Sequence, residues 1–79
     1  MGAQHYSVTA EWDGDAKVWY VNDSDVPGLV AEAPSVENLL TKLNDLIPEL
    51  LRENGVQLTD AVSFSLTART TTEICRNAA

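Results

Sequence analysis

The sequence has little of what most catalytic and metal centres require. It contains one cysteine, Cys75, and one histidine, His5, so it forms no internal disulfide and offers no set of ligands with zinc spacing. No run of about 18 apolar residues occurs, and the N-terminus lacks the pattern of a signal peptide. Phosphate-binding and metalloprotease motifs are also missing. We therefore expect a cytoplasmic protein with no cofactor, no metal and no membrane contact.

Basic residues are scarce as well. The chain has 5 Lys and Arg against 12 Asp and Glu, a formal net charge of −7. Because such a chain repels phosphate backbones, we expect no direct binding to nucleic acid, whereas a basic protein would suit it as a partner. A length of 79 residues with 44% hydrophobic residues predicts one globular domain over residues 1–79. So small a core makes a homo-oligomer, a dimer above all, the expected state.

The first strand is the clearest in the N-terminal half. Residues 5–13 alternate apolar and polar side chains with a period of two, which places Val8 and Trp12 on one face. The dipeptide Asp13-Gly14 then predicts a hairpin, in which we expect the glycine to supply a positive φ. His5 reads as a surface residue.

Two further strands are expected after the hairpin. Residues 17–22 (K-V-W-Y-V-N) are β-branched and aromatic, but both faces of this strand are partly apolar. The pattern therefore leaves open which face carries Trp19 and Val21. A turn at Pro27 and Gly28 leads to a third strand over residues 29–33.

One amphipathic helix follows. Ser35 is the expected N-cap, and Asn54 with Gly55 the expected stop. Pro48 lies within the pattern, but the stripe continues in phase beyond it, so we predict one helix kinked at this proline. The apolar stripe has helical spacing and consists of Val36, Leu39, Leu40, Leu43, Leu46, Ile47, Leu50 and Leu51.

Residues 60–68 alternate again and predict a fourth strand, after which residues 70–79 form a polar tail. The element order is then β-β-β-α-β. It predicts an α+β fold with one helix on a four-stranded mixed sheet, a core over about residues 5–69, and a last strand parallel to an earlier one. The face away from the helix would be polar, with Ser7, Thr9, Glu11, Ser63, Ser65 and Thr67.

Residues 6–51 resemble the HicB-like domain, the toxin-binding part of HicB antitoxins. The similar features are the first strand with its acidic turn, the aromatic strand V-W-Y-V, the segment D-V-P-G-L followed by V-A-E-A, and the helix opening S-V-E-N-L. The acidic residue of that opening, Glu37, stands one place earlier than in the family. The best match is a small-domain branch that keeps V-P-G-L-x-x-E-A and a proline in the helix.

This resemblance implies a degraded ribonuclease H-like fold and a non-catalytic role in binding a small basic ribonuclease toxin, HicA-like in type. Full HicB antitoxins add a DNA-binding module after the last strand, and only about ten residues follow Arg69 here. We therefore expect no operator binding. An acidic domain fits a basic toxin, because opposed charges speed association and fix the register of the complex.

The candidate partner-binding residues are the carboxylates of the turns together with the aromatic strand and the Pro-Gly turn. They are Asp13, Asp15, Trp19, Val21, Asp23, Asp25, Pro27, Gly28 and Glu32. An alternative is a stand-alone oligomeric domain whose open sheet face, with Trp19 and Val21 on it, serves self-association or the binding of a peptide or small ligand. A metal-dependent nuclease is less favoured, because Asp is common in turns for local reasons.

Overall fold

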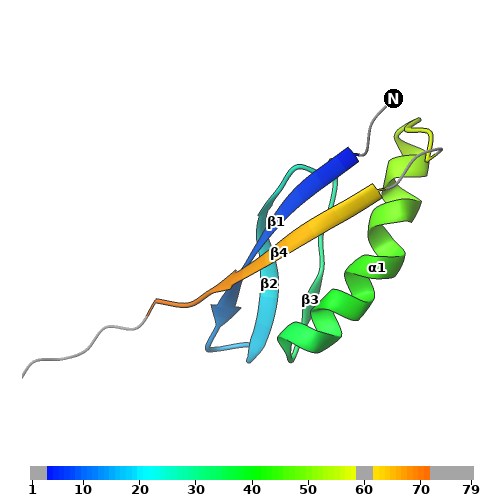
Figure 1. The fold of residues 1–79 in the computed structure, drawn as a ribbon. Helices are drawn as coiled ribbons and strands as arrows, with labels where there is room; N and C mark the ends of the chain where they lie inside the picture. The colour runs from blue at the N-terminus through cyan, green and yellow to red at the C-terminus, as the bar shows by residue number, and fades with distance from the viewer. Residues whose placement is uncertain (1–3, 59–61, 72–79) are drawn as a thin grey trace, which may run out of the picture.

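The computed structural model describes residues 4–58 and 62–71, which form one helix on one face of a four-stranded sheet (Figure 1). The elements in chain order are β1 (Gln4–Asp13), β2 (Val18–Ser24), β3 (Glu32–Ala33), α1 (Val36–Glu53) and β4 (Val62–Arg69). The sheet order is β3-β2-β1-β4, with β4 parallel to β1 and the other pairs antiparallel. The predicted α+β class and the predicted order are confirmed. Most of the polar tail, residues 72–79, lies outside the described residues.

The register of the β1–β2 hairpin settles the facing of β2. Trp12 lies opposite Trp19, and Ala10 lies opposite Val21. Directly opposed residues share a face, and Ala10 is fully buried under the helix. Trp19 and Val21 therefore lie on the face that α1 covers.

The hairpin turn differs from the prediction. The residue with positive φ is Lys17, at 61°, and not Gly14. The Lys17 N–H donates to the carbonyl of Asp13 at 2.7 Å, and the Asp13 carboxylate accepts from the backbone N–H groups of Asp15 and Ala16. The loop between the two strands therefore has four residues, 14–17, instead of the two of a tight hairpin. Its last residue, Lys17, adopts the left-handed conformation.

The third strand is shorter than predicted. Only Glu32–Ala33 pair with β2 as a strand, although the carbonyl of Ala31 still accepts from the Val21 N–H at 3.0 Å. Upstream, Val26 and Leu29 are both buried. The connection therefore bends its apolar side chains into the core instead of running along the sheet edge, and Gly28, at φ 78°, permits that bend.

The helix begins and ends as predicted. The Ser35 hydroxyl accepts from the Asn38 N–H at 3.0 Å, and a single helix runs through Pro48. At its end Gly55 adopts φ 81°, and the Val56 N–H donates to the carbonyl of Leu51 at 2.8 Å, which is a Schellman cap. Among the described residues, no helix has both the length and the hydropathy needed to cross a membrane.

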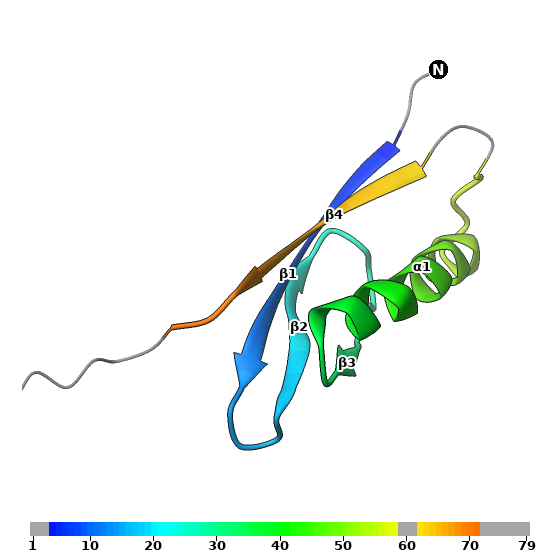
Figure 2. The same ribbon diagram turned by 60° about the horizontal axis from the view of Figure 1, so that its bottom comes forward.

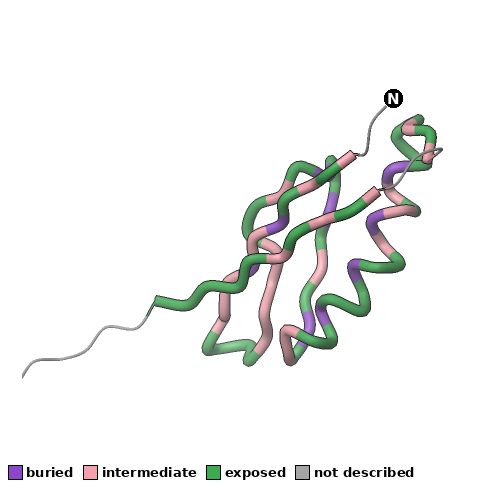
Figure 3. Tube along the Cα trace, in the orientation of Figure 1, coloured by how far each residue is buried: buried purple, intermediate pink, exposed green. Residues whose placement is uncertain are grey.

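The helix covers only part of the sheet. Its row Leu39, Leu43, Ile47 and Leu51 is fully buried, and α1 packs beside β3 and β2 (Figure 2). Buried residues also occur in β1 and in the connection to β3, whereas no residue of β4 is buried (Figure 3). The core thus lies under one half of the sheet, and β4 forms the less covered edge.

Candidate functional site

The predicted partner-binding carboxylates lie at separate places on the sheet. Asp13 and Asp15 stand at the hairpin turn, whereas Asp23 lies opposite Thr9 near the other end of β2. Thr9 and Asp13 are four residue steps apart in β1, which corresponds to about 13 Å along the strand. The structure therefore does not bring these carboxylates together at one point.

That spacing bears on the nuclease alternative. A two-metal site needs carboxylates around ions that are about 4 Å apart. Within residues 4–58 and 62–71, no three His, Cys, Asp or Glu side chains are grouped so that they could hold a metal ion. The turn carboxylates do not provide the arrangement that this alternative requires.

Two of the candidates hold local structure. Asp13 caps its own turn, and one carboxylate oxygen of Asp25 accepts from the Ser7 N–H at 3.1 Å, while the Asp25 N–H donates to the carbonyl of Ser7 at 3.0 Å. Asp15, Asp23 and Glu32 are exposed. A carboxylate with one oxygen bound to the backbone still presents its other oxygen and its charge to solvent, so both groups contribute to an acidic surface.

The β2–β3 side carries most of the candidates, and we name it the acidic edge. It includes a residue that was not among the predicted candidates, Val30, whose side chain is 86% exposed. The signal was present in the alternation, since Leu29, Ala31 and Ala33 face inward and Val30 must then face outward. The acidic edge comprises Asp23, Asp25, Pro27, Gly28, Val30 and Glu32.

Trp19 does not lie on the open face of the sheet. The sequence left the facing of Trp19 and Val21 open, and the open-face position that the alternative function used is wrong, because both lie on the helix-covered face and pack against the core. Trp19 instead contacts Trp12, with ring centroids 5.5 Å apart and planes tilted by 57°.

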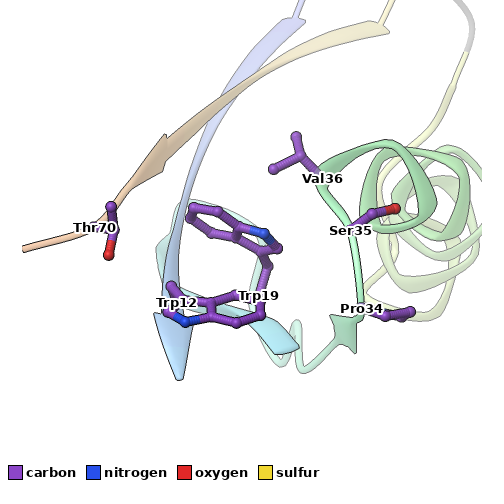
Figure 4. A pocket seen from close by; sticks show the side chains of 6 residues that line it. All are labelled: Trp12, Trp19, Pro34, Ser35, Val36 and Thr70. Carbon is purple, nitrogen blue, oxygen red and sulfur yellow. The ribbon is translucent and has the colours of Figure 1, made fainter. Parts of the chain in front are cut away.

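The two indoles form one wall of a pocket of about 380 Å³ that opens between the hairpin and the start of α1 (Figure 4). We name it the tryptophan pocket. Its position next to β3 follows from the hairpin register, which sequence patterning alone does not fix. Its remaining walls are Pro34, Ser35, Val36 and Thr70.

The open face carries the predicted polar residues of β1 and β4, and the register of β2 adds Val18 and Tyr20 to it. Both ring nitrogens of His5 lie within hydrogen-bond distance of hydroxyls, Nδ1 at 2.8 Å from Ser63 and Nε2 at 2.9 Å from Ser65. Further along, Arg69 pairs with the Glu11 carboxylate at 3.2 Å. These groups lie on the exposed face of the sheet, where they form side-chain contacts between β1 and β4.

Comparisons with known proteins extend this description. No curated protein matches the chain. The crystal structure of hypothetical protein TTHA1013 from the extremely thermophilic bacterium Thermus thermophilus is similar, with 44% identity and a TM-score of 0.70, over 92% of this chain and 100% of that one. The family model described as a domain of unknown function, DUF1902, matches residues 5–76. The chain therefore belongs to the DUF1902 family.

Proposed function

We propose that this domain is a non-catalytic protein-interaction module of the cytoplasm that binds, and thereby neutralises, a small basic ribonuclease. One observation carries the proposal. Residues 11–32 contain six carboxylates and a single lysine, and the described structure presents them on the hairpin turn, the acidic edge and the open face beside it, without gathering them into a metal site. The resemblance to HicB antitoxins supplies the class of partner.

The physical basis of the interaction is charge complementarity around an apolar anchor. Opposed surface charge raises the association rate and suppresses wrong orientations. On the acidic edge, exposed Val30 gives a basic partner an apolar contact between carboxylates. The tryptophan pocket begins at Pro34, directly after Glu32–Ala33, and indole faces also suit the cationic side chain of an Arg or Lys.

The alternative function, self-association or peptide and small-ligand binding through the open sheet face, needed an apolar patch there. That face carries hydroxyls, His5 and the Glu11–Arg69 pair. The register of β2 adds two half-buried side chains to it, Val18 and Tyr20, beside Asp13 and Glu11. The open face therefore offers less apolar surface than Trp19 and Val21 would have supplied, and we place the basic partner on the acidic edge instead.

The proposal is tested by mixing the chain with any small basic protein of toxin size that is encoded beside it. We expect a complex on size exclusion at low salt, inhibition of its RNA cleavage, and an affinity that falls as salt rises. The double variant Asp23→Lys/Glu32→Lys reverses the acidic edge and should weaken binding about tenfold or more.

The matched control is Asp45→Lys/Glu49→Lys, which changes the net charge equally on the helix face away from the core. It should weaken binding much less than the reversal of the acidic edge. The absence of a complex at low salt, or equal losses for the two double variants, would contradict the proposal.

A further inference from the structure

The sheet has two edge strands, β3 and β4, and the β4 edge differs from the β3 edge. β4 has eight residues, contains no proline, and pairs on one side with β1. Within residues 4–58 and 62–71, no strand pairs with its other side. A long edge of this kind presents a row of backbone N–H and C=O groups, which is a template for another strand.

The β4 edge is also the part of the sheet with the least charge. Its only charged residue is Arg69, at the end of the strand, and this side chain pairs with Glu11 of β1. Elsewhere a second copy of this chain would meet carboxylates with carboxylates, in a molecule with a net charge of −7. Like charges placed opposite each other oppose association, so two copies approach most favourably along β4.

The inner face of β4 is apolar but incompletely covered. Phe64 and Leu66 are half-buried, and a groove of about 290 Å³ separates the strand from the helix. On the helix side, Leu40 is 41% exposed and lies in one row with Asn44 and Pro48, which line the groove. Burial of this surface would complete a core that a 79-residue chain leaves open.

We propose that a second copy of this chain occupies the β4 edge, so that two β4 strands pair antiparallel about a two-fold axis and form one continuous sheet. For the helices of both copies to lie on the same face of this sheet, inward-facing residues of one β4 must lie opposite inward-facing residues of the other. With Ser65 on the axis, Phe64 opposes Leu66 of the partner, and each Val62 opposes an Ala68, so the largest inward side chains meet directly. The inference does not rest on the proposed function, because the acidic edge lies on the other side of the sheet.

Analytical ultracentrifugation of the full chain over a range of concentrations tests the proposal. We expect a monomer–dimer equilibrium. Ser65→Glu places two carboxylates opposite each other across the axis and should weaken the dimer about tenfold or more. Thr41→Glu adds the same charge on the exposed face of α1 and should leave the equilibrium unchanged.

A charge-swap experiment separates loss of association from loss of folding. Ser65→Lys alone should also weaken the dimer, whereas an equal mixture of Ser65→Glu and Ser65→Lys should restore it as a heterodimer. Restoration shows that both variants fold.

Cross-linking tests the register. In a Cys75→Ser background, Ser65→Cys should form an intermolecular disulfide, because opposed strand residues lie within the Cα separation that the bond requires. Ser63→Cys faces Thr67 of the partner and should not. A chain that is monomeric at every concentration, a dimer that Ser65→Glu leaves intact, or a Ser65→Cys variant that stays reduced would each overturn the proposal.

Discussion

The two edges of the sheet differ in length, charge and cover. At one edge, β3 has only two residues, Pro34 follows it, and the Lys42 ammonium from α1 donates to the outward carbonyl of Glu32 at 2.7 Å. At the other edge, β4 is eight residues long and has the helix farther away. Shortness, proline and lysine are the devices by which proteins block strand addition, so the β3 edge is protected and the β4 edge is not.

This difference fits the two contacts that we propose, one at each edge. The protected edge carries exposed carboxylates and an exposed valine, which suits side-chain recognition of a basic partner without pairing of backbones. The unprotected edge is nearly neutral and suits backbone pairing with a second copy. The two proposed contacts use opposite sides of the sheet, so they do not exclude each other.

The largest expected effect tests whether the helix covers the two halves of the sheet unequally. It compares two leucines in the layer between the helix and the sheet. Leu43→Ala removes a fully buried helix side chain and should lower the free energy of unfolding by about 2–5 kcal/mol. Leu66→Ala removes a half-buried side chain of β4 and should lower it by about 1 kcal/mol. Urea unfolding followed by tryptophan fluorescence measures both, at a concentration at which the chain is monomeric.

The same two variants test whether the poorly covered strand β4 is also the strand that forms the dimer. As protein concentration rises, the loss caused by Leu66→Ala should grow, because the wild-type dimer buries this side chain and the variant buries less. The loss caused by Leu43→Ala should not change in this way. Equal losses at low concentration would show that the helix covers both halves of the sheet alike, and the comparison of edges would fail.

The loop at the acidic edge and the hairpin turn give the next largest contrast. Gly28→Ala forces a Cβ onto a backbone with φ 78°, so it should cost about 1–2 kcal/mol although no atom lies within 4 Å of the new methyl group. Gly14→Ala, at the hairpin, places its Cβ at an ordinary 3.7 Å from the Trp12 indole nitrogen and needs no positive φ. It should leave stability within about 0.5 kcal/mol. Thermal unfolding of the two variants checks the difference, and a cost for Gly14→Ala equal to that of Gly28→Ala would contradict it.

These glycines also show where prediction from sequence succeeds and where it stops. The cap at Ser35, the stop at Gly55 and the strand patterns were predictable, because each depends on neighbours in the chain. The hairpin turn was not, since Asp13 uses its own carboxylate to set the turn and moves the positive φ to Lys17.

The position of the candidate site residues depends more on strand register than the caps and turns do, and strand register is set by residues far apart in the chain. The turn carboxylates and Pro27-Gly28 were identifiable as exposed, but the facing of Trp19 followed only from its pairing with Trp12 and Ala33. The unequal cover of the sheet had no signal in the pattern of β4, because Phe64 and Leu66 alternate just as fully covered residues do. Cover is set by where the helix crosses the sheet, which periodicity does not encode.

The smallest expected effect concerns the protection of the β3 edge itself. Lys42→Ala removes the ammonium from the Glu32 carbonyl, and because this contact is exposed, water replaces most of it. We expect a loss of about 0.5–1 kcal/mol in urea unfolding. Lys17→Ala changes the net charge equally and keeps a β-carbon at the same φ, so it serves as the control and should cost less. If Lys42→Ala also creates a dimer that survives Ser65→Glu, then the lysine, and not the shortness of β3, blocks strand pairing at that edge. If no such dimer appears, two strand residues are too few to pair with another chain, and strand length is what distinguishes the two edges.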